Sequence, residues 1–214
     1  LDMYLSRVEI DIGNRRKIRD LTHLGAYHNW VEDCFSYSED EMHRERKLWR
    51  IDILGGHPYL LLQSREEPNM EMLERYGVEG SARVKPYRKF LDSIQEGKKY
   101  HFRATLNPVM SKSLGKGKRG KVIPYHTVEN QMKFLFEKSE KNGFLLREDE
   151  IKIVDRRIEN LKKKGMRDTS FSVVTYEGIL TVTDPEVFRE GLTCGIGKKK
   201  AYGCGLMTVI PLSR

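Results

Sequence analysis

Histidines are the side chains of this sequence best suited to moving protons, because an unperturbed imidazole titrates near pH ~6.5. His28, in "GAYHNWVEDCF", lies near an apolar stripe of helical spacing. From the residues alone it is therefore either a catalytic group or a half-buried packing residue, with little to choose between them. His23 is the second candidate. The other histidines stand in loop or strand contexts, where surface or packing roles are expected: His43, His57, His101 and His126.

Positive charge is the second chemical feature, and it is concentrated in three segments of the C-terminal half. The whole chain has a net charge of +8. "SKSLGKGKRGK" (111–121) has five basic residues and no acidic one, and residues 152–167 have seven basic against two acidic residues. The third segment is "GIGKKKAYGCG" (195–205). A single lysine-rich loop is usually just solvated, but three in one half favour a polyanion such as nucleic acid.

The glycine-rich segment 195–205 has the composition of a phosphate-binding loop. Glycines let backbone N–H groups approach a phosphate and adopt positive φ, and the lysines add charge. The segment lacks the G-x-x-x-x-G-K-[ST] pattern, which excludes a P-loop. It also follows an expected helix and precedes a strand, whereas the dinucleotide-binding fingerprint G-x-G-x-x-G follows a strand and precedes a helix, so that fingerprint is excluded too. The alternative is a tight connection with exposed lysines. The residues expected to bind phosphate are Gly195, Gly197, Lys198, Lys199, Lys200, Gly203 and Gly205.

The two other basic segments are predicted to contact RNA. Residues 152–167 are expected at the tip of a hairpin, which could follow the deep groove of an RNA duplex near a stem end. The alternative for both segments is a solvated loop, and both descriptions can hold if binding orders the chain. The residues expected to contact RNA are Lys112, Lys116, Lys118, Arg119, Lys121, Arg156, Arg157, Lys162, Lys163, Lys164 and Arg167.

No metal or cofactor is predicted. The carboxylates and histidines show no H-x-x-x-H or D-x-D spacing. The cysteines are odd in number and without a C-x-x-C pair, so neither a zinc site nor a disulfide framework is expected, and a reducing cytoplasm fits best. They are Cys34, Cys194 and Cys204. No apolar run approaches the ~18 residues of a membrane span, so we expect no membrane partner. We also expect the isolated protein to be a monomer.

The periodicity of the first half predicts the order β-α-β-β-α-β. The expected strands are 3–12, 46–54, 58–64 and 82–90. The expected helical stretches are 14–21, 26–35 and 69–76. Gly25 is expected to interrupt the first two, and "GGH" between the second and third strands indicates a hairpin turn.

A second cycle of the same order follows. Its expected strands are 98–109, 144–162, 169–184 and 206–210. Its expected helices are 127–141, with Thr127 as cap and Gly143 just past its end, and 185–192, with Pro185 at the first position. The sequence therefore predicts an α+β protein of two tandem ferredoxin-like (RRM-like) domains, residues 3–92 and 97–214.

Both ends of the chain resemble a known family. "MYLSRVEI" at the start, "RATLNP" (103–108) and "GIGKKKAYGCGLMTVI" at the end are similar to the CasE-type endoribonucleases of type I-E CRISPR systems. The resemblance covers nearly the whole chain. It implies a metal-free enzyme that cuts CRISPR precursor RNA at the base of each repeat hairpin, stays bound to its product and joins the other subunits of the Cascade complex.

The resemblance also implies catalytic residues. His28 matches the family's catalytic histidine in the first helical region. Family members often carry a tyrosine three positions earlier, where this chain has Gly25. Tyr27 is adjacent to His28 instead, and adjacent helical residues diverge by about 100°. Tyr27 is therefore a weaker candidate, which would have to reach the site from an irregular turn at Gly25.

Metal-free cleavage uses the 2′-hydroxyl of the RNA as nucleophile and gives a 2′,3′-cyclic phosphate and a 5′-hydroxyl. Histidine would transfer protons, and cations would stabilise the phosphorane. Two other functions stay open. A non-catalytic RNA-binding scaffold subunit would bind without cutting, and a metal-dependent nuclease would lose activity in EDTA.

Overall fold

The computed structural model describes residues 2–36, 45–112, 115, 120–161 and 169–212. The chain folds as two compact units. The N-terminal unit contains residues 1–93 and 200–206, and the C-terminal unit contains 94–199 and 207–214. Residues 200–206 thus fold with the N-terminal unit, although the sequence pattern groups them with the second predicted domain.

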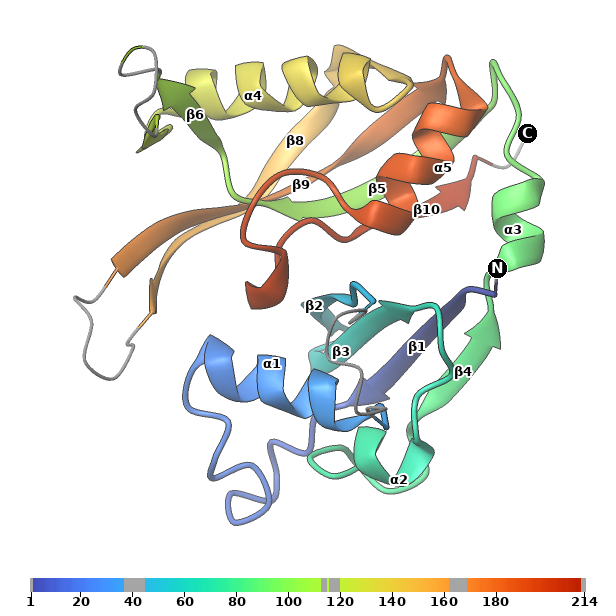
Figure 1. The fold of residues 1–214 in the computed structure, drawn as a ribbon, viewed down its shortest axis with the longest axis vertical. Coiled ribbons are helices and arrows are strands. Elements are labelled where there is room, and N and C mark those ends of the chain that lie inside the picture. Colours follow the sequence, from blue (N-terminus) through green and yellow to red (C-terminus); the bar gives the residue numbers. More distant parts are fainter. Residues whose placement is uncertain (1, 37–44, 113–114, 116–119, 162–168, 213–214) are drawn as a thin grey trace. The chain divides into compact units, whose positions relative to one another are not determined.

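The N-terminal unit is built on an antiparallel sheet in the order β2-β3-β1-β4. Its strands are β1 (Tyr4–Glu9), β2 (Leu48–Leu54), β3 (His57–Ser64) and β4 (Arg83–Pro86). Its helices are α1 (Leu24–Asp33), α2 (Met70–Leu73) and α3 (Arg88–Asp92). Helices α1 and α2 lie on one face of the sheet (Figure 1). The turn between β2 and β3 has positive φ at both Gly55 and Gly56, as its glycines predict.

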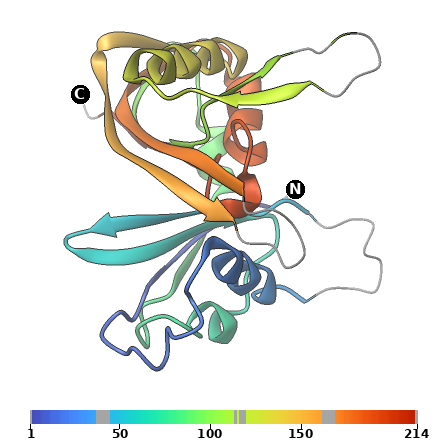
Figure 2. The same cartoon turned by 90° about the vertical axis from the view of Figure 1, so that its left-hand side faces the viewer.

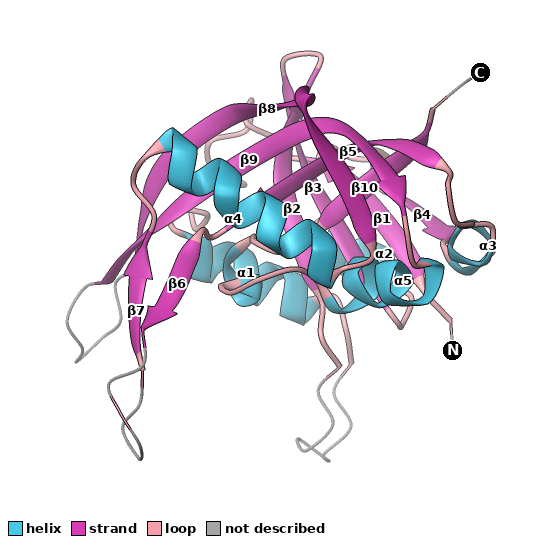
Figure 3. Cartoon of the chain, turned by 90° about the horizontal axis from the view of Figure 1, so that it is seen from above, coloured by secondary structure: helices cyan, strands magenta, loops and turns pink. Residues whose placement is uncertain are grey.

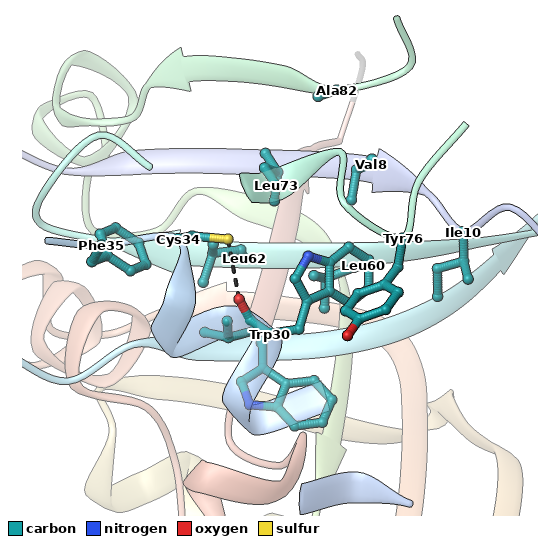
Figure 4. Packing of buried hydrophobic residues seen from close by; sticks show 12 residues of the cluster. Val8, Ile10, Trp30, Cys34, Phe35, Leu60, Leu62, Leu73, Tyr76 and Ala82 are labelled. Atoms are coloured by element: carbon teal, nitrogen blue, oxygen red, sulfur yellow. Dashed lines mark hydrogen bonds between the residues drawn. The ribbon is translucent and has the colours of Figure 1, made fainter. Parts of the chain in front are cut away.

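A hydrophobic core fills the space between this sheet and α1. Val8, Leu60 and Leu62 contribute from the sheet, and Trp30 packs edge-on to Tyr76 with ring centroids 5.3 Å apart. Figure 4 shows these side chains and the hydrogen bond from the Cys34 thiol to the Trp30 carbonyl, 3.2 Å long. Each large apolar side chain buried here stabilises the unit by roughly 1.5–3 kcal/mol. This core fixes the position of α1.

The region before α1 differs from the sequence prediction. Residues 14–21 form turns and not a helix, since Asn14 folds the chain locally by accepting a hydrogen bond from the Lys17 amide. Gly25 does not interrupt α1 but lies in its first turn. His23 caps the helix, and a Cβ on Gly25 would approach its Nδ1 to 2.9 Å. Glycine therefore makes room for the cap.

The C-terminal unit has a second antiparallel sheet, in the order β10-β5-β9-β8. Its strands are β5 (Lys99–Leu106), β8 (Phe144–Leu161), β9 (Thr169–Val182) and β10 (Met207–Pro211). Its helices are α4 (Val128–Lys141) and α5 (Pro185–Cys194), which lie on one face of the sheet (Figure 3). The prediction of an α+β protein is confirmed by these two four-stranded sheets.

Several local predictions are confirmed in this unit. Thr127 caps α4, and Asp184 caps α5 directly before Pro185. Strands β8 and β9 form the expected long hairpin, seen as a curved ribbon in Figure 2. A two-stranded ribbon of β6 (Val109–Lys112) and β7 (Lys121–Pro124) was not predicted. Likewise the predicted extended segment 82–90 ends at Pro86, and α3 follows.

None of the described helices is long and apolar enough to cross a membrane.

Candidate functional site

Helix α1 presents the His28 imidazole at the surface of the N-terminal unit. The side chain is 33% exposed, so substrate can reach it. Its Nδ1 lies 3.9 Å from Oε1 of Glu32, one helical turn later. The ring centroid lies 6.2 Å from that of Tyr202, with the planes inclined at 56°. Because Nδ1 faces a carboxylate, the opposite nitrogen Nε2 is the one directed away from Glu32.

Glu32 also contacts a lysine. Its Oε2 lies 3.2 Å from Nζ of Lys47, whose side chain is only 8% exposed and whose Nζ lies 4.8 Å from the centre of the Phe35 ring. The carboxylate thus stands between an imidazole and a buried ammonium group. This arrangement orients the His28 ring, with Nδ1 toward the Glu32 carboxylate that Lys47 also contacts.

Tyr27 lies on a different side of α1. Its ring stacks on that of Trp49 with centroids 6.0 Å apart and planes at 18°, and it also lies 6.3 Å from the ring of Trp30. Burial raises the pKa of its phenol. The helix is regular here, so the irregular turn expected at Gly25 is absent. Packing against tryptophan is what the structure assigns to Tyr27, and its catalytic role stays a prediction.

The second histidine candidate has a structural role. Nδ1 of His23 accepts a hydrogen bond from the Ala26 amide, 3.2 Å long, which caps α1. Nδ1 of His57 contacts the carboxylate of Glu9 at 2.7 Å, away from α1 on β3. His43 lies outside the described residues. His28 is thus the histidine that α1 displays beside a carboxylate and a second ring.

Part of the glycine-rich segment forms the surface next to His28. Residues Lys200–Tyr202 make a 3₁₀ turn, η2, which contacts α1 within the N-terminal unit. Gly203 follows with a φ of 77°, and a Cβ there would lie 3.0 Å from Cζ3 of Trp49. Only glycine fits this conformation at this distance. Gly205, with a φ of 94°, also adopts a conformation that favours glycine.

The remainder of the segment belongs to the C-terminal unit and contacts the basic segment 111–121 and strand β9. Nζ of Lys198 donates a hydrogen bond to Oγ of Ser111 on β6, 3.1 Å long. Nζ of Lys199 lies 4.9 Å from the centre of the Phe171 ring on β9. Gly195 and Gly197 have φ values of 77° and 82°. The glycine-rich segment therefore contacts the segment 111–121 and the strand β9, which pairs with residues 152–161 of the third basic segment.

The ribbon β6–β7 holds the ends of the segment 111–121. Lys112 and Lys121 are exposed and stand opposite each other across the ribbon. Like charges in this position are destabilising unless an anion lies nearby. Other predicted residues of this segment lie outside the described part of the chain: Lys116, Lys118 and Arg119.

The part of the β8–β9 hairpin nearer its tip orients two arginines differently. Arg156 donates from Nε to Oε1 of Gln131 at 2.8 Å and from Nη2 to the His126 carbonyl at 2.6 Å. Arg157 forms ion pairs with Asp155 and Glu159, so acidic neighbours balance its charge. The other residues predicted at the tip lie outside the described chain: Lys162, Lys163, Lys164 and Arg167.

Comparison with known proteins identifies the family. A family model described as CRISPR associated protein matches residues 3–211. This chain belongs to that family.

The CRISPR-associated relatives match over their full length. The endoribonuclease Cse3 of Thermus thermophilus is 31% identical over 220 residues, which cover 98% of this chain and 100% of that protein. The Cascade subunit CasE of Escherichia coli is 27% identical with the same coverage. A structure of Cse3 bound to a 19-nucleotide RNA has 28% identity and a TM-score of 0.79, covering 99% of this chain and 100% of that chain. The resemblance to CasE-type proteins is confirmed.

Sequence reasoning missed two cations of this CRISPR-associated protein. No sequence pattern marks Lys47 as a site residue, because only the packing of the chain before β2 near α1 brings it to Glu32. Lys138 looked like an ordinary exposed lysine of α4, but its Nζ lies 5.4 Å from the centre of the Phe134 ring. Burial lowers the pKa of Lys138, as do the charges of Lys141 and Lys198. The effect of Lys198 places Lys138 beside the glycine-rich segment.

Among the described residues, no three histidine, cysteine or carboxylate side chains are grouped so that they could hold a metal ion.

Proposed function

We propose that this protein is an endoribonuclease that binds the CRISPR repeat hairpin in precursor RNA, cleaves it at the base of the stem and keeps the product as a Cascade subunit. The observation that carries the proposal is the accessible His28 imidazole beside Glu32, in a chain similar over its full length to Cse3, which has been captured with RNA. The similarity to CasE, named as a Cascade subunit, supports the partner assignment.

We also infer that both units are ferredoxin-like. Each has the element order β-α-β-β-α-β around a four-stranded antiparallel sheet. In each, the first strand of the unit lies between the third and the fourth, and the second lies at an edge. This order supports the ferredoxin-like topology.

In the proposed reaction the ribose 2′-oxygen attacks the adjacent phosphorus, so a P–O2′ bond forms and the P–O5′ bond breaks. Nε2 of His28 either accepts the proton of the 2′-hydroxyl or donates a proton to the leaving 5′-oxygen. Glu32, which faces Nδ1, orients the ring during this transfer. The products are a 2′,3′-cyclic phosphate and a 5′-hydroxyl, and no step needs a metal ion.

The C-terminal unit supplies the binding surface in this proposal. Lys198 of the glycine-rich segment contacts the β6–β7 ribbon and Lys199 contacts strand β9, so this unit carries lysines and glycine amides close to one another. Such groups bind phosphates without reading bases directly. An RNA duplex offers mainly phosphates and shape, which suits this surface.

Incubation with an RNA that contains one repeat hairpin, in the presence of EDTA, tests the function. We expect a single cut whose 3′ end is a cyclic phosphate. His28→Ala should abolish cutting and leave binding intact, whereas His57→Ala, which removes an exposed histidine of the same unit, should cut normally. Cleavage by His28→Ala at the normal rate would refute the mechanism.

Two outcomes would select another function. Tight binding of the repeat by the wild-type protein without any cut would indicate a non-catalytic scaffold subunit. Cleavage that disappears in EDTA and returns with a divalent cation would indicate a metal-dependent nuclease.

A further inference from the structure

We infer that Tyr202 is a second catalytic side chain, whose phenol donates a hydrogen bond to the phosphate that is cut beside His28. The inference rests on the proposed function. Its basis is the contact between the two rings, with centroids 6.2 Å apart and planes inclined at 56°. Both side chains are partly exposed and belong to the same compact unit.

The separation of the rings suits one shared ligand. A hydrogen bond to oxygen spans about 2.7–3.0 Å, so a single phosphate can accept from an imidazole and from a phenol at this spacing. The pair therefore has the geometry of two groups that meet at one phosphate.

The position of Tyr202 is fixed by its neighbours along the chain. Gly203 lies against the Trp49 ring, where a Cβ would come within 3.0 Å. Further on, Nη1 of Arg50 donates to the Leu206 carbonyl at 2.9 Å. Arg50 is itself held by both carboxylate oxygens of Asp52, at 2.8 and 2.7 Å. A donor fixed in this way costs no reorganisation during the reaction.

The residues of α1 near His28 do not offer the same group. Position 25 is a glycine, and a side chain there would crowd the His23 ring that caps the helix. The ring of Tyr27 stacks on Trp49. The 3₁₀ turn η2, distant in sequence, is thus the element that brings a phenol to the imidazole.

The phenol has a defined part in the proposed reaction. When the P–O2′ bond forms, negative charge grows on the non-bridging phosphate oxygens. A neutral phenol can donate one hydrogen bond to such an oxygen without losing its proton. The proton balance of the reaction stays with His28. Loss of one preorganised donor typically slows a reaction by about 10²-fold.

Tyr202→Phe tests the inference, because it keeps the ring and removes only the hydroxyl. We expect single-turnover cleavage of the repeat RNA to slow by about 10²-fold. The dissociation constant for RNA and the melting temperature should stay the same. Tyr59→Phe is the matched control, since it removes a half-buried hydroxyl on β3 that donates to Glu9, and its cleavage rate should be unchanged.

The pH dependence of the rate separates direct contact from an effect through His28. If Tyr202 donates directly to the phosphate, loss of its hydroxyl lowers the rate by the same factor at each pH and leaves the profile in place. A profile displaced along the pH axis in Tyr202→Phe would mean that Tyr202 acts only by positioning the imidazole, which would overturn the assignment.

The remaining outcomes distinguish this inference from the proposed function. Normal cleavage by Tyr202→Phe together with no cleavage by His28→Ala would overturn the inference and leave the function standing. Slow cleavage by Tyr27→Phe with normal cleavage by Tyr202→Phe would assign the phenol to α1. A wild-type protein that cuts no repeat RNA would overturn both.

Discussion

At the scale of single residues, Gly203 shows how backbone and packing constrain the candidate site together. Its φ of 77° is unfavourable for any residue with a Cβ, and Trp49 leaves no room for one. We expect Gly203→Ala to lower the free energy of unfolding by about 2–4 kcal/mol, since strain of about 1 kcal/mol adds to overpacking of about 1–3 kcal/mol. Urea denaturation measures the change.

Gly80→Ala separates the two contributions. Gly80 has a φ of 70°, but nothing lies within 4 Å of the position of its Cβ. This variant should lose only about 1 kcal/mol from its left-handed conformation. Equal losses in the two variants would show that Trp49 yields to the methyl group.

Cysteine reactivity is a second residue-scale prediction. Burial raises the pKa of the Cys34 thiol to about 12, and the charges of Asp33 and Glu32 add to the effect. Cys204 is also buried, whereas Cys194 is exposed. Because the thiolate is the reactive form, a disulfide reagent such as DTNB should label one thiol in the native protein and three after denaturation. Rapid labelling of two thiols in the native state would contradict this burial.

The same shift has a consequence for stability at high pH. The folded chain keeps Cys34 protonated, while the unfolded chain ionises it near the ordinary value of 9.0. Stability from this group is therefore present below pH 9 and is lost as the pH rises toward 12. Cys34→Ala should show a smaller decline over that range in urea denaturation.

At the scale of elements, a buried ion pair within β2 holds Arg50, which joins this strand to the segment 200–206 by its hydrogen bond to the Leu206 carbonyl. The side chains of Arg50 and Asp52 are 2% and 4% exposed. We expect Arg50→Met to lower the free energy of unfolding by about 3–5 kcal/mol, because it leaves a buried carboxylate without its guanidinium. Arg88→Met, which breaks the exposed pair with Asp92, should cost less than about 1 kcal/mol. Thermal unfolding of both variants compares them.

The cap of α5 gives a second prediction for an element. Oδ1 of Asp184 accepts hydrogen bonds from the amides of Glu186 and Val187, at 3.0 and 3.1 Å. Asp184→Ala should destabilise the protein by about 1 kcal/mol, and Asp184→Ser, which retains a capping oxygen, should cost less. The two melting temperatures provide the measurement, and equal values would argue against the cap.

The elements were predictable where the signal was local. Thr127 and Pro185 mark helix starts by their own chemistry, and the alternation of 144–184 indicates a hairpin. The β6–β7 ribbon was not predictable, because the glycines and lysines between its strands look like an unstructured loop. Residues 14–21 show the converse. Their helical spacing is outweighed by the Asn14 turn, which competes for the same backbone groups.

At the scale of the whole molecule, charge predicts the salt dependence of RNA binding. Each phosphate contact releases counterions, so log K should fall linearly with log salt. Replacing Lys112 and Lys121 together with alanine should reduce the magnitude of the slope by about 1.5, or roughly 0.7–0.9 per contact. A double replacement of Lys85 and Lys89, exposed lysines of the N-terminal unit, should leave the slope unchanged. Filter binding at several salt concentrations measures both.

The candidate site was predictable only in part for a reason at this scale. His28 and the basic segments are visible as residue types, and family resemblance adds a role. The partners of His28 are not visible in this way. Lys47 and Tyr202 come from distant parts of the chain, and only folding brings them to α1.

The discontinuity of the N-terminal unit has a consequence for how the protein is made. During translation residues 1–93 leave the ribosome before the strip 200–206, which covers Trp49 and accepts a hydrogen bond from Arg50. The nascent N-terminal unit therefore leaves one face of Trp49 uncovered until residues 94–199 have also been synthesised. A product truncated before residue 200 lacks the turn beside His28, so it should fold without a complete site.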